Sequence, residues 1–498
     1  QKRERERVCE VFLSWNTMAS VQPENRRFRP SYRGSGPKRG VLGAERRGTN
    51  KGLGPRPRKQ PTFREEVGAK PKEQRIGTTC FMKYPNPPMS ELEVENTSPE
   101  ELSKKVVYLD WNATTPIYPE VADAMEPYLR IHYGNPSSGH LRGRVSNEAV
   151  RKAREQVARL VGADSDEDIC FTSCGTEADN WVILGSVERA KSEFNIEVPH
   201  VVTSNIEHPA IIECLKYLKS KGRITYTEVP VNQSGIVDAN AVVEAVQKDT
   251  CLCTIMHSNN EIGSLQPVEE IGRMLSARHP NVWFHTDAAQ SIGKVDFDVK
   301  SMNVDFATIV GHKFGAPKGI GALYIRKGLK IDSFLMGGGQ ESKRRAGTEN
   351  ILHIVGIGAA AEIARIEGKQ LQHRYLTLKN RMRSEFEKVF AEHSSRLHFN
   401  GPEDDSLMLP NTLSLSIEGV NANALIDRLG FAVALSAGAA CHSNATSASS
   451  VLSAIGLPLE LALGTMRLSV GRSTKELEID AAVKLICKEA FMQLESTA

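Results

Sequence analysis

The chain has 498 residues, of which 40% are hydrophobic, and this length allows two domains and an appended segment. Its net charge of +3 is unevenly spread: residues 1–78 carry 20 Lys and Arg against eight Glu, so the remaining residues have a net charge of −9. This acidic remainder argues against nucleic acid as a partner. No apolar run approaches the roughly 18–20 residues of a membrane span, so we expect no membrane partner either.

The N-terminal segment is rich in Arg, Pro and Gly and contains few apolar residues that could be buried. Such a composition is typical of disorder, so we expect residues 1–104 to form a disordered basic tail. The tail could be absent from the mature protein, since the chain begins with Gln and Met18, Met82 and Met89 are alternative starts. We expect a cytoplasmic location, with a mitochondrial one as the alternative if the tail is retained as a targeting segment.

The nine cysteines are scattered and odd in number. In a chain of this size they argue against a secreted disulfide framework and favour a reducing compartment. Cys251 and Cys253 have no second pair or histidine at zinc spacing, so we expect no metal site. If their segment is a strand, both thiols should share one face and be buried in the core.

From about residue 105, strand-like and helix-like patterns alternate. Val106–Leu109 is a short apolar run, and residues 145–161 place their apolar side chains on one helical face. Further strands are predicted at 168–172, 200–204, 251–256, 282–286 and 304–310. Because most of these runs are almost continuously apolar, they indicate a largely parallel sheet that helices bury on both faces. The sequence therefore predicts a large α/β domain over residues 105–365.

A second, smaller α/β domain is predicted over residues 366–498. Its elements in chain order are a helix at 371–390, a strand at 411–418, a helix at 422–429, a strand at 431–436, a short helix, a strand at 465–470 and a long helix. We expect the last helix to begin at Ser473, because Ser473 to Glu476 has the pattern of a capping box.

Lys313 follows the predicted strand 304–310 and precedes a Gly-rich turn. A lone lysine after a strand is usually a solvated loop residue. Burial, however, would disfavour its ammonium form and make it an amine suited to a Schiff base. Asp287 ends the preceding strand; alone it would be interpreted as a helix cap. A carboxylate there could also keep the ring nitrogen of pyridoxal phosphate protonated, so that the ring accepts electrons.

Two more strand ends carry candidate cofactor contacts. The turn at Gly175 and Thr176 joins a strand to a helix, so its backbone N–H groups could hold a phosphate, although such turns are often only tight connections. His208 could stack on a cofactor ring and transfer a proton, although a lone His is more often structural. Polar groups near other strand ends come from three loops, at 112–116, 134–138 and 257–261. Since ligands of open α/β sheets bind at the carboxyl ends of strands, these loops together predict one site.

Together these motifs closely resemble the class V aminotransferase superfamily, and within it the cysteine desulfurase and selenocysteine lyase family. The resemblance runs from about Tyr108 to Leu494 and rests on the segments YLDWNATTP, GNPSS, SCGTEADN, IEHPAI, NNEIG, HTDAAQ, GHKFGAPKGIGALY, GGGQESKRRAGTEN, LSAGAACHS and MRLSVGR. It implies fold type I of the PLP-dependent transferases, pyridoxal 5'-phosphate as the cofactor, and a homodimer with shared active sites.

The resemblance also implies a role for each matching residue. Lys313 would carry the cofactor, His208 would stack on its ring, and Asp287 would pair with the ring nitrogen. The other cofactor contacts would come from Asn260 and Gln290 at the ring hydroxyl, Gly175, Thr176 and His312 at the phosphate, and Thr348 at the phosphate of the partner subunit. Arg467 would bind the substrate carboxylate, a task suited to a guanidinium, and Asn112 would also lie at the substrate.

Cys441 narrows the implied function. Alone it would be interpreted as a buried structural cysteine, but it matches the sulfur-accepting position of the family. The implied reaction removes sulfur or selenium from L-cysteine or L-selenocysteine, leaves L-alanine, and carries the chalcogen on Cys441 as a persulfide. An acceptor protein could then take it. The sequence departs from the family at Val310, where members often have a phosphate-binding Ser, so we expect one phosphate contact fewer.

Three alternatives stay open at this point. The Asp-Trp-Asn-Ala-Thr-Thr-Pro and Ala-Cys-His-Ser variants resemble selenocysteine lyases and their bacterial relatives more than the iron–sulfur assembly desulfurases, so the sequence leans toward selenium without deciding the substrate. A transaminase of the same superfamily is a second class of enzyme, against which the motif around Cys441 argues. In a non-catalytic sulfur-transfer scaffold, the third alternative, the Lys313 motif would have no function.

Overall fold

The computed structural model describes residues 106–438 and 448–497, which all belong to one compact unit of the chain. The predicted tail at 1–104 and the predicted sulfur acceptor Cys441 lie outside the described residues. Among the described helices, none is long and apolar enough to cross a membrane.

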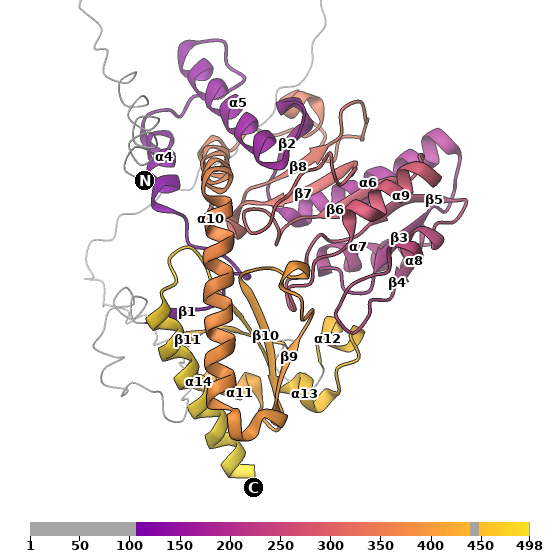
Figure 1. The fold of residues 1–498 in the computed structure, drawn as a ribbon. Coiled ribbons are helices and arrows are strands. Elements are labelled where there is room, and N and C mark those ends of the chain that lie inside the picture. Colours follow the sequence, from indigo (N-terminus) through magenta and orange to yellow (C-terminus); the bar gives the residue numbers. More distant parts are fainter. Residues whose placement is uncertain (1–105, 439–447, 498) are drawn as a thin grey trace, which may run out of the picture. The chain divides into compact units, whose positions relative to one another are not determined.

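A seven-stranded sheet forms the centre of the larger part of the fold (Figure 1). Its strands are β2 (Ile169–Thr172), β3 (His200–Ser204), β4 (Thr225–Val229), β5 (Thr250–Thr254), β6 (Trp283–Asp287), β7 (Phe306–Val310) and β8 (Gly321–Ile325), in the order β2-β8-β7-β6-β5-β3-β4. Strands β4, β3, β5, β6 and β7 are parallel, whereas β8 runs antiparallel to both β7 and β2. The predicted largely parallel sheet is therefore confirmed, and β2 runs in the same direction as β7.

Helices cover both faces of this sheet. The core on one face contains apolar side chains of α6 (Gly175–Phe194) and α7 (Pro209–Ser220). The core on the other face contains those of α4 (Pro119–Arg130), α5 (Leu141–Val161), α8 (Ala239–Glu244), α9 (Val268–Arg278) and the first half of α10 (Ile351–Val389). All residues of β2, β3, β5, β6, β7 and β8 are buried, which explains their continuously apolar sequences.

The predicted strands missed β4 and β8, for different reasons. Strand β4 lies at the edge of the sheet, and its sequence TYTEV alternates polar residues that remain partly exposed. Strand β8 begins directly after the Gly-rich turn, and its first residue, Gly321, is of the kind expected in that turn rather than in a strand.

Cys251 and Cys253 are both buried, as predicted, but they do not share a face. Cys251 belongs to the core beneath α6 and α7, whereas Cys253 belongs to the opposite core. The register between β3 and β5 shifts at this point, so that Thr250 and Leu252 pair with consecutive residues of β3 and Cys251 is left over. Such a bulge reverses the alternation of side chains, which is why the prediction of one shared face was wrong.

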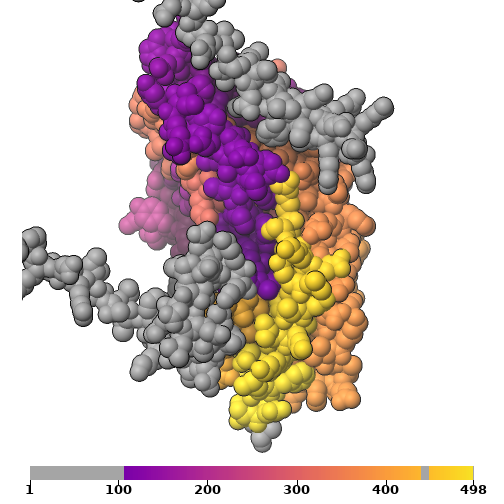
Figure 2. Space-filling model, turned by 90° about the vertical axis from the view of Figure 1, so that its left-hand side faces the viewer, coloured from indigo at the N-terminus to yellow at the C-terminus, as the bar shows by residue number. Residues whose placement is uncertain are grey.

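The C-terminal residues form a second sheet with its own core. It contains β9 (Leu397–Asn400), β10 (Thr412–Ile417), β12 (Ser436–Ala437) and β13 (Thr465–Ser469), all antiparallel, in the order β12-β13-β10-β9. The first described strand, β1 (Val107–Tyr108), pairs in parallel with β11 (Val433–Ala434). The helices are α11 (Ala422–Leu429), α12 (Ser450–Ala454), α13 (Leu459–Leu463) and α14 (Glu476–Thr497). Figure 2 shows the first described residues, in indigo, against the C-terminal residues, in yellow, consistent with contacts between β1 and α14.

Three predictions in this part need correction. The predicted strand 431–436 is divided into β11 and β12, which pair with different partners. The predicted single short helix is a pair, α12 and α13. The last helix does not begin at Ser473: it begins at Glu476, where the backbone N–H of Lys475 donates to the Glu478 carboxylate at 2.8 Å. The capping interaction is thus formed two residues later than the pattern indicated.

Helix α10 connects the two cores. Its first half contributes Ile354, Ile357 and Ala360 to the core of the large sheet, and its second half contributes Tyr375 and Phe386 to the C-terminal core. Each large apolar side chain buried completely in this way stabilises the fold by about 1.5–3 kcal/mol. The predicted helix 371–390 is therefore the second half of a 39-residue helix. The predicted domain boundary at residue 366 lies inside it and stays a prediction.

A buried ion pair fixes the segment that precedes α10. Arg154 on α5 donates from both terminal nitrogens to the Glu341 carboxylate, at 2.6 and 2.7 Å, and the backbone N–H of Phe171 donates to the same carboxylate at 2.9 Å. Both side chains of the pair are largely buried. Removal of one partner would therefore leave an uncompensated charge away from solvent.

We expect Glu341→Gln to lower the free energy of unfolding by about 3 kcal/mol, because Arg154 would lose its counter-charge while the shape of the side chain is kept. Urea unfolding followed by circular dichroism would measure the loss. Glu213→Ala, which breaks the exposed pair with Lys216, is the matched control and should change stability little. Equal effects of the two substitutions would contradict a special contribution of the buried pair.

Candidate active site

The carboxyl ends of the strands that run in one direction meet at a single edge of the large sheet. Asp287 ends β6, Lys313 follows β7, His208 follows β3, and Gly175 follows β2. Because β2 runs in the same direction as β7, all four residues lie at this edge. The structure thus brings together the strand-end residues that the sequence singled out.

Lys313 lies on a single 3-10 turn, Gly311–Lys313. Its Nζ donates to the backbone carbonyls of Asn112, at 2.6 Å, and Ala113, at 3.0 Å. Burial lowers the pKa of Lys313 to about 8; the charge of Arg467 lowers it further, and the charges of Asp287 and Asp110 oppose the shift. The neutral amine is therefore accessible near neutral pH, as a nucleophilic or basic lysine requires.

Asp287 is only 5% exposed. Its Oδ1 accepts a hydrogen bond from the backbone N–H of Ala289 at 2.8 Å, and within the described residues it forms no ion pair. Burial raises the pKa of Asp287, while that hydrogen bond and the charges of His208 and Lys313 lower it. A cationic N–H group placed next to this carboxylate would stabilise its ionised form.

His208 caps the N-terminus of α7: its Nδ1 accepts a hydrogen bond from the backbone N–H of Ala210 at 3.1 Å. This bond places the proton of the neutral ring on Nε2. The residue is exposed at the edge of the sheet. Partial desolvation lowers the pKa of His208, Asp287 raises it and Lys313 lowers it, so a neutral ring is available to stack on a ligand.

Helix α6 begins at Gly175, and its N-cap residue Cys174 makes no side-chain cap. The first backbone N–H groups of α6, including that of the exposed Thr176, therefore donate no hydrogen bond to a capping side chain. A helix N-terminus of this kind favours the binding of an anion. A Cβ atom on Gly175 would lie only 2.5 Å from Cγ2 of Val310, so glycine is needed at this position. Val310 presents a methyl group here, and the expected loss of one phosphate contact stays a prediction.

His312 also lies at this edge. Its Nδ1 is 3.1 Å from the hydroxyl oxygen of Thr114. Burial lowers the pKa of His312 to about 4, and the positive charges of Lys313 and Lys318 add to the shift. The ring is therefore neutral at physiological pH and could interact with a phosphate only as a neutral hydrogen-bond donor.

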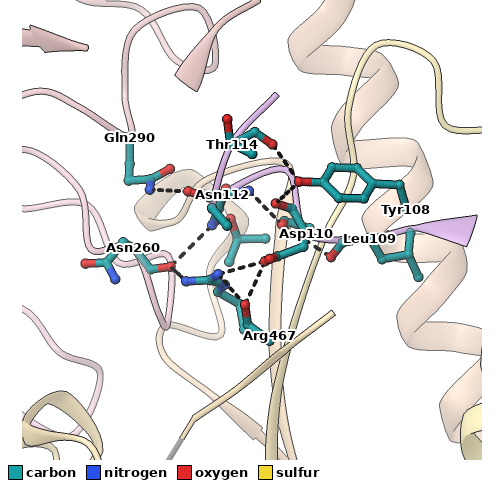
Figure 3. Close-up of polar contacts among 12 residues, drawn as sticks. Tyr108, Leu109, Asp110, Asn112, Thr114, Asn260, Gln290 and Arg467 are labelled. Carbon is teal, nitrogen blue, oxygen red and sulfur yellow. Dashed lines mark hydrogen bonds and ion pairs between the residues drawn. The ribbon is translucent and has the colours of Figure 1, made fainter. Parts of the chain in front are cut away.

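Asn112 joins many of these groups, and Figure 3 shows its contacts. Its backbone carbonyl accepts from Lys313 and from Nε2 of Gln290, at 2.9 Å. Its side chain is committed to protein partners, because Nδ2 donates to Thr412 at 2.8 Å and Oδ1 accepts from Lys294 at 3.0 Å. The backbone of Asn112, rather than its carboxamide, thus faces Lys313. Its predicted contact with the substrate stays a prediction.

Arg467, on β13, is held by three protein groups (Figure 3). Nη1 donates to the backbone carbonyl of Asn260 at 2.9 Å, and Nη2 donates to Asp110 and to Ser436, both at 2.8 Å. Nε is buried and has no partner among the described residues. A carboxylate ligand of this guanidinium would therefore have to displace Asp110. The sequence motif contained Asp110, but no role was assigned to it.

The remaining predicted residues are more scattered. The carboxamide of Asn260 points away from Arg467 (Figure 3), and Thr348 is exposed on the segment before α10. The loop 134–138 lies between α4 and α5 rather than at a strand end, so that prediction was wrong. Cys441 is outside the described residues.

These residues fit pyridoxal phosphate by their chemistry. The site combines a lysine of lowered pKa, a buried carboxylate that forms no ion pair among the described residues, and a helix N-terminus whose first residue must be glycine. An aldehyde, a protonated ring nitrogen and a phosphate would complement these three features in turn. An α/β fold with a site of this chemistry is suited to a pyridoxal-phosphate enzyme.

The chain belongs to the class V aminotransferase family, whose model matches residues 107–482. It is 40% identical, over 396 residues, to the cysteine desulfurase IscS of Methanosarcina thermophila; the match covers 79% of this chain and 93% of that protein. Among solved structures, a NifS-like protein is 35% identical with a TM-score of 0.70, covering 77% of this chain and 98% of its own. SspA in complex with cysteine is 34% identical with a TM-score of 0.62, covering 73% and 98%.

The resemblance predicted from the sequence is thus confirmed, including the fold of the family and its placement among the cysteine desulfurases. Members of this family in general depend on pyridoxal phosphate.

Substitution of Lys313 by Met should make the stability of the cofactor-free protein less dependent on pH. The unfolded lysine has a pKa near 10.5 and the folded one about 8, so folding at pH 7 carries the full cost of burying the charge, about 3 kcal/mol. Between pH 8 and 10.5 the unfolded state binds more protons, so wild-type stability rises with pH. The Met variant should therefore gain most over wild type at pH 7 and lose most of that gain by pH 10.

Urea unfolding of the cofactor-free wild type and variant at pH 7, 8.5 and 10 would test this. Lys318→Met, at an exposed lysine of the Gly-rich turn that follows Lys313, is the control and should show a constant difference from wild type. A constant difference for Lys313→Met as well would show that Lys313 carries no such cost.

Proposed function

We propose that the protein is a pyridoxal-phosphate-dependent enzyme that removes sulfur or selenium from L-cysteine or L-selenocysteine and leaves L-alanine. The observation that carries the proposal is Lys313, an amine of lowered pKa held by two backbone carbonyls at the sheet edge that also presents Asp287. The relatives named cysteine desulfurase and the structure of SspA with cysteine support the substrate class.

Each residue at the edge of the sheet has a task in this proposal. When bound, the cofactor supplies an acceptor for the electrons that remain when the substrate Cα loses its proton. Asp287 keeps the ring nitrogen protonated, His208 stacks on the ring, and the Lys313 amine, once free, takes the Cα proton. Contacts to the ring hydroxyl come from Asn260 and Gln290, and contacts to the phosphate come from Gly175, Thr176 and His312.

Arg467 binds the substrate carboxylate, and Asn112 helps to shape the same pocket. Because Asp110 accepts a hydrogen bond from Nη2 of Arg467, the incoming carboxylate exchanges with Asp110. Thr348, which is exposed ahead of α10, reaches the phosphate in the partner subunit of a homodimer.

Cys441 accepts the chalcogen in this proposal. Its thiolate attacks the sulfur or selenium atom of the substrate, the bond from that atom to the substrate Cβ breaks, and a new bond forms to the Cys441 sulfur. The electron pair of the broken bond stays on the substrate, whose Cβ takes up a proton; Lys313 then returns a proton to Cα, and the product leaves as alanine. An acceptor protein or a thiol then removes the persulfide.

The described cysteines support a reducing compartment, because Cys170, Cys174, Cys214, Cys251, Cys253 and Cys487 are all free. We propose a cytoplasmic location, with a mitochondrial one if the basic tail is retained. A transaminase of the same family and a non-catalytic scaffold remain the alternatives that experiments must separate.

Two substitutions separate the cofactor from the sulfur acceptor. Lys313→Ala should abolish the yellow colour of the purified protein, because it removes the amine that binds the cofactor. Cys441→Ala should keep the colour but lower sulfide release from cysteine by more than about 100-fold, since the thiol that accepts sulfur is gone. Absorbance spectra and sulfide and alanine assays would measure both. A colourless wild type would refute the cofactor, and full turnover of Cys441→Ala with a keto acid would indicate a transaminase.

The choice of chalcogen needs a direct comparison. A selenol ionises more readily than a thiol, so removal of selenium requires a less reactive thiolate at Cys441 than removal of sulfur does. If the enzyme is a general desulfurase, we expect kcat/KM for cysteine and selenocysteine within about tenfold of each other. A dedicated selenocysteine lyase would instead show negligible alanine formation from cysteine under the same conditions.

A further inference from the structure

Lys294 is a second buried lysine beside the proposed active site, and neither the sequence motifs nor the proposed mechanism gives it a task. It lies in the turn after β6 and is only 4% exposed. Within the described residues it forms no ion pair with a carboxylate. A buried amine without a counter-charge is costly, so its contacts need an explanation.

The amine of Lys294 binds two side-chain amides. Its Nζ donates to Oε1 of Gln290 at 2.6 Å and to Oδ1 of Asn112 at 3.0 Å. Burial lowers the pKa of Lys294 well below its ordinary value, and the charges of Lys313 and Arg467 lower it further. The two hydrogen bonds match the two N–H groups that a neutral amine retains.

These contacts determine how both amides are oriented. In the structure the Lys294 amine donates both hydrogen bonds, so each amide turns its oxygen toward Lys294. The amide nitrogen of Gln290 then faces the carbonyl of Asn112, to which it donates at 2.9 Å. The amide nitrogen of Asn112 faces the hydroxyl of Thr412 at 2.8 Å.

The same carbonyl of Asn112 accepts the 2.6 Å hydrogen bond of Lys313. Lys294 therefore holds the side chain of Asn112. It also holds the amide of Gln290, which donates to the same Asn112 carbonyl as Lys313 does. An amide of Gln290 with the opposite orientation would place its oxygen against the Asn112 carbonyl, where two acceptors repel each other. It would also turn an acceptor, instead of a donor, toward the ring hydroxyl that Gln290 is proposed to bind.

We propose that Lys294 is a positioning residue that sets the orientation of the Gln290 and Asn112 amides and thereby places the carbonyl that binds Lys313. The proposal rests on the proposed function of this site, since its consequence is the reactivity of Lys313 toward the cofactor. Lys294 itself touches neither the substrate nor the reacting atoms in this role.

A buried lysine could also act only as part of the core, and the chain offers a matched control for this possibility. The side chain of Lys379, on α10, is 2% exposed and donates to the Asp405 carboxylate at 2.6 Å in the C-terminal part of the fold. Lys379→Met removes a lysine of similar burial but has no contact with Asn112 or Gln290. Any effect common to both variants reflects folding alone.

The experiment uses the full-length protein, freed of cofactor and then mixed with pyridoxal phosphate. Thermal unfolding of the cofactor-free protein measures stability, and the growth of visible absorbance measures the rate at which Lys313 binds the cofactor. We expect Lys294→Met and Lys379→Met both to lower Tm, but only Lys294→Met to slow the absorbance growth, by about tenfold, and to shift the absorption maximum.

One further variant keeps the test decisive if Lys294→Met does not fold, and a double variant tests the coupling if it does. Lys294→Gln retains an N–H donor and should recover most of the rate. Gln290→Met combined with Lys294→Met should slow the rate by less than the product of the two single effects, because Lys294 acts partly through Gln290.

The possible outcomes separate this proposal from the proposed function. Absence of visible absorbance in the wild type, or equal absorbance in Lys313→Ala, would refute the proposed function itself. Normal binding in the wild type, together with equal rates for Lys294→Met and Lys379→Met, would refute only the role of Lys294. Multiplicative effects of the Lys294 and Gln290 substitutions would exclude the coupling through the amide.

Discussion

The hydrogen bond from the Lys313 amine to the backbone carbonyl of Asn112 joins the end of β7 to the segment after β1, and the rest of the site is arranged around it. Asn112 is 1% exposed, and its other contacts reach the C-terminal sheet: its backbone N–H donates to Ser469 of β13, and its carboxamide donates to Thr412 of β10. The lysine at the edge of the large sheet is thus positioned by residues of the C-terminal sheet, so the site depends on both sheets being in place.

The amines of Lys313 and Lys294 and the carboxylate of Asp287 share one property: they are desolvated and form no ion pair among the described residues. Lys313, Lys294 and Arg467 bring basic groups together, while Asp287 lies at the same edge without an ion pair among the described residues. Such an arrangement lowers stability, because burial penalises each charged form. It also keeps amines neutral and a carboxylate available for a cationic ligand, which is why perturbed groups gather at functional sites. The energetic cost and the proposed chemistry have the same physical origin.

The accuracy of the sequence predictions followed the range of the interactions involved. Strands β2, β3, β5, β6 and β7 were predicted because burial on both faces leaves a continuous apolar run. The edge strand β4 lacked that signature, and a bulge opposite β3 placed Cys251 and Cys253 on opposite faces. The beginning of α14 was misplaced because Glu478, two residues beyond the predicted Glu476, accepts the capping hydrogen bond.

The sequence alone determined that Asp287, Lys313 and His208 end or follow strands, and parallel strands necessarily bring their carboxyl ends to one edge. Only the tertiary structure decided what surrounds them. Arg467 meets Asp110 across 357 residues, and Lys294 meets Asn112 across 182. No local pattern of hydrophobicity or turn residues encodes such contacts, since they arise only when separate elements pack and each buried polar group must find a partner.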